Sequence, residues 1–214
     1  MTKKTLLLGC NWYPTKYQNT KGIFFKNHAE AFSQKKYISK VVIFCVSTSI
    51  KDFLEKGFFK KIIESKKIIS IHITIPLGRF INSRKIISFF TSFSYEIFVK
   101  KELKGKVSNQ LIFLSQNISP LSNFLEHESI KLNAKHIVIE HSTGLENYSK
   151  RYALNLKKSL IKSEIYTVSK SLKKKLRTTY KLDSKDTINC LSPQWTKISR
   201  ELLLKPTKIK QIKN

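Results

Sequence analysis

The chain has 214 residues, of which 41% are hydrophobic, and carries a formal net charge of +27. This length suits one α/β domain, and the apolar content is sufficient for a packed core. The charge favours an anionic partner, namely nucleic acid, an acidic lipid surface or a phosphorylated ligand.

The positive charge is almost entirely lysine. Proteins that read nucleic-acid sequence usually rely on arginine for bidentate contacts. The composition therefore favours solvated lysines with a weak attraction to an anionic membrane over specific nucleic-acid binding. The arginines are Arg79, Arg84, Arg151, Arg177 and Arg200.

Cys10, Cys45 and Cys190 each lie inside or at the end of an apolar run. An odd count without CxxC spacing argues against a disulfide framework or a zinc site. We expect small core residues in a reducing compartment, with no metal and no cofactor. The N-terminal apolar run is too short for a signal peptide. No window reaches the length of about 18 apolar residues that a membrane-spanning helix needs.

Apolar runs of strand length alternate along the chain with longer segments of helical spacing. Strands are predicted at residues 5–10, 40–46, 67–75, 110–116, 135–142, 163–169 and 186–192. Helices are predicted at residues 22–36, 80–103, 119–133, 148–162 and 170–180. Ser119 and Pro120 suit the N-cap and the first position of the third helix.

This alternation predicts βαβ units, and hence an α/β fold: a Rossmann-like parallel sheet with helices on both faces. We expect residues 1–195 to form this domain and residues 196–214 to form a basic C-terminal tail. Ligands of such sheets bind at the carboxyl ends of the strands, near the point where the strand order reverses.

The first candidate site follows the first strand. A long loop begins at Asn11, and Gly22 lies at the entry to the next helix. A helix N-terminus with a glycine suits a phosphate group, and Lys16, Lys21 and Lys26 add positive charge. The alternative is a glycine that only eases the turn. The stretch has neither a GxGxxG nor a Walker lysine motif.

The second candidate site is the end of the strand at residues 135–142. Glu140, His141, Ser142 and Thr143 follow one another there. A histidine can donate to a phosphate or a sugar hydroxyl, and a carboxylate can orient a hydroxyl or act as a base. The alternative is that Glu140 and His141 cap a helix or pair with lysines. Other histidines lack this placement and are expected on the surface or in the core: His28, His72, His127 and His136.

The third candidate is Ser169, between the strand at residues 163–169 and the following helix. A serine in this position can cap the helix. It could equally line a cleft at the edge of the sheet.

These segments together resemble the N-terminal domain of family 4 glycosyltransferases of the GT-B fold. Trp12-Tyr13-Pro14 and Gly22-Ile23-Phe24 are similar to the opening of that domain. Glu140-His141-Ser142 and the Ser169–Leu172 segment look like two later strand-end motifs of the family. The resemblance covers roughly residues 5 to 192.

The resemblance implies a retaining, sugar-nucleotide-dependent transferase of cell-surface polysaccharide or glycolipid synthesis. In this family the N-terminal domain binds the acceptor, which would be a saccharide or a lipid-linked sugar. Gly22 would approach the donor diphosphate, and His141 would contribute to the reaction centre with Glu140. Asn11, Lys21, Ser142 and Ser169 would line the substrate site.

The sequence departs from the family near its end. The family's P-N pair is replaced by LSPQW at residues 191–195, and nothing after Trp195 resembles the donor-binding domain with its paired glutamates. We therefore expect the chain alone to be inactive, and to be cytoplasmic or peripheral at the inner face of the plasma membrane. Two alternatives are a non-catalytic α/β binding module derived from a transferase and a basic nucleic-acid-binding protein. No helix-turn-helix, zinc-finger or RNA-recognition signature supports the latter.

Overall fold

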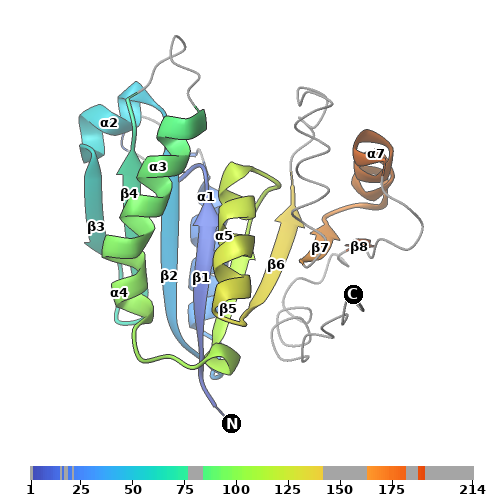
Figure 1. Cartoon of the computed structure of the whole chain (residues 1–214), viewed down its shortest axis with the longest axis horizontal. Coiled ribbons are helices and arrows are strands. Elements are labelled where there is room, and N and C mark those ends of the chain that lie inside the picture. The colour runs from blue at the N-terminus through green and yellow to red at the C-terminus, as the bar shows by residue number, and fades with distance from the viewer. Residues whose placement is uncertain are drawn as a thin grey trace.

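The computed structural model describes residues 2–14, 16, 19–20, 22–76, 84–141, 163–181 and 188–190. These residues form an α/β protein around one eight-stranded sheet, with the strand order β3-β4-β2-β1-β5-β6-β7-β8 (Figure 1). The predicted Rossmann-like arrangement is confirmed. The predicted helix at residues 148–162 and the tail at residues 196–214 lie outside the described residues.

The predicted strands all occur, within a few residues of their expected bounds, and all are parallel. The central strands carry continuous apolar runs because both of their faces are covered. The bounds are β1 Lys4–Cys10, β2 Ile38–Ser47, β4 Ile68–Thr74, β5 Leu111–Ser115, β6 Lys135–Glu140, β7 Glu164–Thr167 and β8 Ile188–Cys190.

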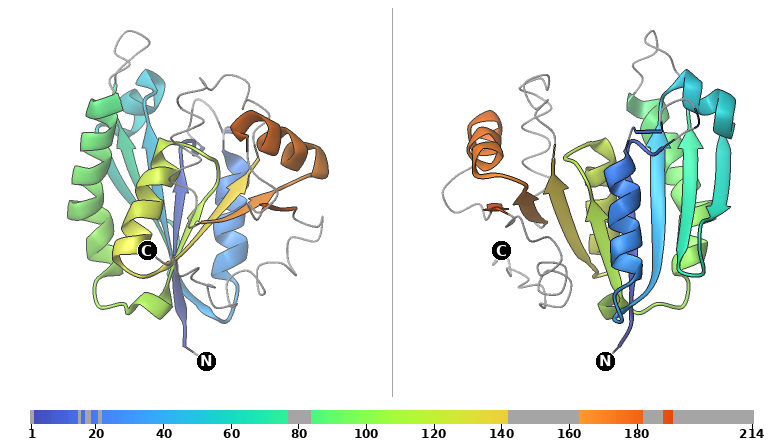
Figure 2. Two further views of the ribbon diagram at one scale, coloured as in Figure 1. Left: turned by 45° about the vertical axis from the view of Figure 1, so that its right-hand side comes forward. Right: turned by 180° about the vertical axis from the view of Figure 1, so that it is seen from behind.

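The helices cover both faces of the sheet. In Figure 2, α1 lies on one face, and α3, α4 and α5 lie on the other. Ser119 caps α5 and accepts a hydrogen bond from the Ser122 amide at 3.3 Å, with Pro120 at the first helical position, as predicted. The bounds are α1 Ile23–Ser33, α3 Arg84–Ser94, the π-helical turn η1 Tyr95–Val99, α4 Lys100–Leu103, the 3₁₀ turn η2 Ser108–Gln110, α5 Pro120–Lys131 and α7 Lys170–Tyr180.

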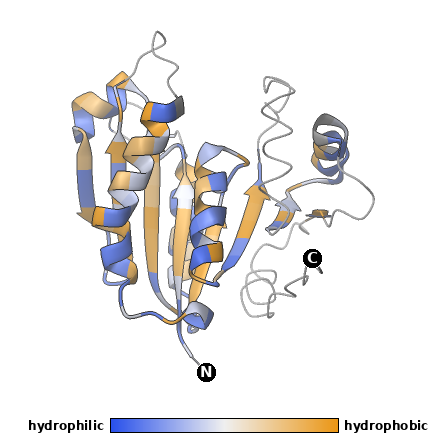
Figure 3. Cartoon of the chain, in the orientation of Figure 1, coloured by the Kyte–Doolittle hydropathy of each residue, from blue (hydrophilic) through white to orange (hydrophobic). Residues whose placement is uncertain are grey.

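Alternation along β1 divides the core into two layers. Leu6, Leu8 and Cys10 pack on the α1 side, whereas Leu7 packs on the side of α5. Figure 3 shows this apolar centre as strands that are largely orange. Gly9 allows α5 to approach β1 closely, since a Cβ at this position would lie 2.2 Å from the Leu125 Cδ1 atom.

One segment was not predicted. Residues 48–66 contain the short helix α2, Ile50–Lys56, and the strand β3, Phe59–Ile63. Ser49 caps α2, and Gly57 ends it with a φ of 67°. Strand β3 is antiparallel to β4, so the sheet is not parallel throughout. Its exposed lysines are typical of an edge strand, where charge prevents pairing with another chain.

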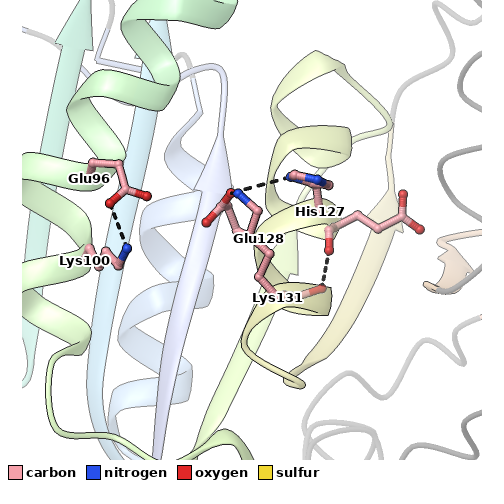
Figure 4. A network of polar contacts seen from close by, with 7 residues as sticks. Glu96, Lys100, His127, Glu128 and Lys131 are labelled. Atoms are coloured by element: carbon pink, nitrogen blue, oxygen red, sulfur yellow. Dashed lines mark hydrogen bonds and ion pairs between the residues drawn. The ribbon is translucent and has the colours of Figure 1, made fainter.

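Ion pairs lie on α5 and on the segment from the turn η1 to α4 (Figure 4). Glu96 and Lys100 pair at 2.8 Å, and Glu128 lies 2.7 Å from Lys131 and 3.6 Å from His127. The exposed pair of Glu96 and Lys100 contributes little to stability because water and salt screen it. The fold therefore depends mainly on its two apolar layers.

Tyr95 offers a test of the layer on the α5 side. Its side chain is fully buried, and its hydroxyl has no hydrogen-bond partner among the described residues. Burial raises the pKa of this hydroxyl. We expect Tyr95→Phe to raise the free energy of unfolding by about 1 kcal/mol, because the variant no longer buries an unsatisfied polar group. Urea denaturation measures the change.

Tyr13→Phe is the matched control. The Tyr13 hydroxyl donates to the two carboxylate oxygens of Glu64 at 2.6 and 2.7 Å. This variant should lose about 1.5 to 3 kcal/mol, since the hydrogen bond is made to a charged group. Equal losses in the two variants would contradict our description of Tyr95.

Candidate functional site

The strand order reverses beside β1. The chain passes from β1 through α1 to β2 on one side, and later returns to β5 on the other side of β1. In such sheets the ligand crevice opens outside the carboxyl ends of the two strands at this point. Asn11 follows β1 here and is half-buried, while Gln116 follows β5 and is fully buried.

His141 lies directly after β6, at the same edge of the sheet. Its Nε2 atom is 2.7 Å from the Gln116 Oε1 atom. Its ring centroid lies 5.2 Å from that of Phe24 and 6.4 Å from that of Phe25, both in the first turn of α1. The structure thus brings two predicted segments together: the entry to α1 and the end of β6.

His28 belongs to the same cluster, although the sequence placed it with the surface and core histidines. Its ring lies 5.7 Å from that of His141 and 6.0 Å from that of Phe24. It also makes a side-chain hydrogen bond with Gln116. One signal in the sequence could have placed His28 in the cluster. It lies four residues after Phe24 in the helix that begins after Gly22, so the two side chains share one face of that helix.

Burial sets the protonation of both rings. It lowers the pKa of His141 to about 4, and the nearby His28 ring lowers it by a smaller amount. It also lowers the pKa of His28, against which the hydrogen bond to Gln116 acts. Both imidazoles are therefore neutral near pH 7, and each can offer one donor and one acceptor nitrogen to a ligand.

Gln116 connects the two histidines to the end of β5, beside the point where the strand order reverses. Its side chain is fully buried between the two histidines' segments, and its Nε2 atom has no hydrogen-bond partner among the described residues. A buried amide nitrogen is costly to leave unsatisfied. A ligand hydroxyl or phosphate oxygen could accept from this group.

Glu140 has a different position from His141. It is fully buried, and its Oε2 atom accepts a hydrogen bond from the Ile118 backbone N–H at 2.7 Å. Ile118 lies between β5 and α5, next to the segment that carries Gln116. Glu140 therefore holds that connection in place, which is a positioning role.

Gly22 is required by a close approach of the backbone. It is the N-cap of α1, its φ is 73°, and a Cβ here would lie 2.7 Å from the carbonyl oxygen of Trp12. The loop after β1 therefore folds back onto the N-terminus of α1. The other two candidates in these segments, Lys21 and Ser142, lie outside the described residues.

Ser169 caps α7, which is one of the two roles predicted for it. Its hydroxyl accepts a hydrogen bond from the Leu172 N–H at 3.1 Å. The side chain is exposed, and among the described residues no hydrogen bond joins it to the His141 cluster. Three other histidines lie elsewhere: His72 and His136 in the core and His127 on the surface.

The described residues contain no group of three or more histidine, cysteine or acidic side chains able to hold a metal ion. None of the described helices has both the length and the apolar character needed to cross a membrane. No protein-family model and no curated protein sequence matches this chain.

Proposed function

We propose that the chain is the acceptor-side domain of a retaining, sugar-nucleotide-dependent glycosyltransferase with a GT-B fold, acting in cell-surface polysaccharide or glycolipid synthesis. The observation that carries the proposal is the contact of His141 with the first turn of α1, at the edge where the strand order reverses. This places a neutral imidazole beside a helix N-terminus that favours phosphate.

The chemistry divides between two parts of the cluster. The N-terminus of α1, where Gly22 permits close approach, is suited to the donor diphosphate. The neutral imidazole of His141 is suited to a sugar hydroxyl, as hydrogen-bond donor or acceptor. The family resemblance adds Asn11, Lys21 and Ser142 as candidate contacts, whereas the Ser169 hydroxyl is used as the cap of α7.

An exposed apolar stripe supports a lipid-linked acceptor at an anionic membrane surface. Phe89 and Phe93 are 63% and 47% exposed, and their rings stack with centroids 6.1 Å apart. Ile97 continues the stripe one turn further. Lysines flank it on the same helical segment, at positions 85, 100 and 101. Aromatic side chains among cations suit the interface of an acidic bilayer.

The double variant Phe89→Ser, Phe93→Ser tests this surface. We expect its affinity for vesicles containing phosphatidylglycerol to fall about tenfold or more. The variant loses two exposed phenyl rings, which would be partly buried in the lipid on binding. Vesicle co-sedimentation at fixed salt measures the change. The control, Leu54→Ser, removes another exposed apolar side chain, on α2. An equal loss in control and double variant would contradict the assignment of the stripe.

Histidine NMR tests the proposed site. With ¹⁵N-histidine labelling, the five imidazoles can be assigned by single His→Gln variants. We expect millimolar UDP-glucose or GDP-mannose to shift the signals of His141 and His28, while those of His72 and His136 stay in place. Ligand contact changes the hydrogen bonding of the first pair only.

The outcomes separate the functional classes. If a saccharide shifts the two signals, but neither a sugar nucleotide nor inorganic diphosphate does, the non-catalytic binding module is favoured. Shifts only with a nucleic-acid oligomer, lost steeply as salt rises, would favour the nucleic-acid reading. A folded protein whose His141 and His28 respond to none of these ligands would contradict the proposal.

A further inference from the structure

Three buried side chains form a row across the sheet, apart from the His141 cluster. Cys10 of β1 is the register partner of Cys45 in β2, and Cys45 is the register partner of His72 in β4. All three are at most 3% exposed. Register partners on parallel strands point to the same face. The row therefore places two thiols and an imidazole side by side.

The spacing of the two cysteines suits a disulfide. Neighbouring strands lie about 4.8 Å apart. Disulfides join residues whose Cα atoms are about 4.4 to 6.8 Å apart. Each of the two thiols is close enough to the other to shift its pKa. A bond between the two sulfur atoms would therefore need little movement of either strand.

A buried ammonium group lies beside the row. Lys56 of α2 is 8% exposed, and its Nζ atom donates to the Pro14 carbonyl oxygen and to the Nδ1 atom of His72, both at 3.3 Å. It also lies 5.5 Å from the ring centroid of Tyr13. No ion pair joins Lys56 to a carboxylate within the described part of the chain. A buried charge is normally neutralised by a nearby opposite charge.

The surroundings favour a thiolate at Cys45. The neighbouring Cys10 thiol lowers the pKa of Cys45, burial acts in the opposite direction, and His72 and the charge of Lys56 lower it further, to about 5. Burial raises the pKa of Cys10. The pair is therefore asymmetric, with an anionic sulfur at Cys45 that balances Lys56 and a protonated thiol at Cys10.

We propose that Cys10 and Cys45 are a dithiol site that a hydroperoxide oxidises to an intramolecular disulfide. The Cys45 thiolate attacks one oxygen of hydrogen peroxide. The O–O bond breaks, and the other oxygen takes up a proton and leaves as water. Cys45 is then a sulfenic acid. The Cys10 thiol attacks this sulfur and forms the S–S bond, and the sulfenic hydroxyl leaves as water with the Cys10 proton.

Atoms and electrons balance over the two steps of the oxidation. The two sulfur atoms together lose two electrons, and the peroxide is reduced to two molecules of water. Hydrogen peroxide is small, which suits a pair of thiols that are each only 3% exposed. The proposal does not depend on the proposed glycosyltransferase function, because it uses no residue of the His141 cluster.

Peptide mapping of the full chain tests the proposal. The reduced protein is treated with hydrogen peroxide, unfolded in an alkylating agent and digested. We expect a linked peptide pair containing Cys10 and Cys45, and loss of their alkylation. Cys190 lies on β8 and serves as the internal control, which should remain alkylated. Circular dichroism before alkylation confirms that the oxidised protein is folded.

Variants assign the roles. In Cys10→Ser, dimedone should label Cys45 as a sulfenic acid, whereas in Cys45→Ser it should leave Cys10 unlabelled. Lys56→Met should slow disulfide formation about tenfold near pH 7, with the difference closing at higher pH, because the thiolate fraction falls. The proposal is overturned if Cys10 and Cys45 of the folded wild-type chain stay fully alkylatable after peroxide treatment, whatever the state of Cys190.

Discussion

Replacing Gly22 with alanine should lower the free energy of unfolding by about 3 kcal/mol. An L-residue with a left-handed backbone conformation costs about 1 to 2 kcal/mol. Overpacking a well-packed site costs about 1 to 3 kcal/mol more. Both apply here, because φ is 73° and the new Cβ would lie 2.7 Å from the Trp12 carbonyl oxygen. That oxygen belongs to the backbone and cannot rotate away as a flexible side chain would.

Gly105→Ala separates the two costs. Gly105 has a φ of 78°, and a Cβ there would meet nothing within 4 Å. This control should lose only about 1 kcal/mol, from the backbone conformation alone. Urea denaturation of both variants gives the comparison. Equal losses would mean that the loop after β1 moves away from α1 at no cost, and the close approach at Gly22 would then not define the site.

The variant also bears on the proposed function. If the N-terminus of α1 binds the donor diphosphate, Gly22→Ala should weaken the shift that a sugar nucleotide causes at His141, even under conditions where the variant is fully folded. Gly105→Ala should leave that shift unchanged. A variant that is folded and responds like the wild type would separate Gly22 from the ligand site.

The strands were predictable because of how they are buried. A parallel strand covered on both faces, such as β2, must be apolar at almost every position, and such runs stand out in the sequence. α2 and β3 lack this signal. α2 has only seven residues, and β3 carries two adjacent exposed lysines, Lys60 and Lys61, so that it lacks the alternation of a half-buried strand. Short elements of this kind are stabilised by caps and by pairing with β4, which local periodicity does not reveal.

The site was predictable only in part, for a related reason. His141 and Gly22 follow from a general rule, that ligands bind where parallel strands end. His28 and Gln116 depend on three-dimensional relations: which face of α1 meets the end of β6, and that β5 lies between β1 and β6. The same holds for Cys10, Cys45 and His72. The sequence indicated buried cysteines, whereas their pairing follows from the register of three strands that are far apart in the chain.

Acidification should destabilise the fold well before the carboxylates are neutralised. Burial lowers the pKa of His136 to about 3 and that of His141 to about 4. In the unfolded chain each titrates near its ordinary value of about 6.5. Between these values the unfolded state binds more protons than the folded state, so stability rises with pH. The stabilisation is complete above about pH 6.5 and is lost as pH falls toward the folded-state values.

The expected size follows from the same linkage. Between pH 7.5 and pH 5 each ring contributes a loss of about 2 kcal/mol, and the two together about 4 kcal/mol. For His136 the cause is its enclosure: the Nε2 atom lies 2.9 Å from the Ser115 hydroxyl, and the Nδ1 atom lies 2.7 Å from the Ser163 hydroxyl. Neither neighbour carries a charge that could stabilise an imidazolium.

Urea denaturation of three variants at pH 7.5, 6 and 5 measures this dependence at constant salt. His136→Gln should cost stability at every pH, because it disturbs a buried network, yet it should reduce the loss between pH 7.5 and pH 5 by about half. His141→Gln should reduce that loss to a similar extent. His127→Gln is the control, since the His127 side chain is 68% exposed, and its pH dependence should match the wild type. If all three variants lost stability with pH as the wild type does, the two buried imidazoles would not be the groups that make the fold sensitive to acid.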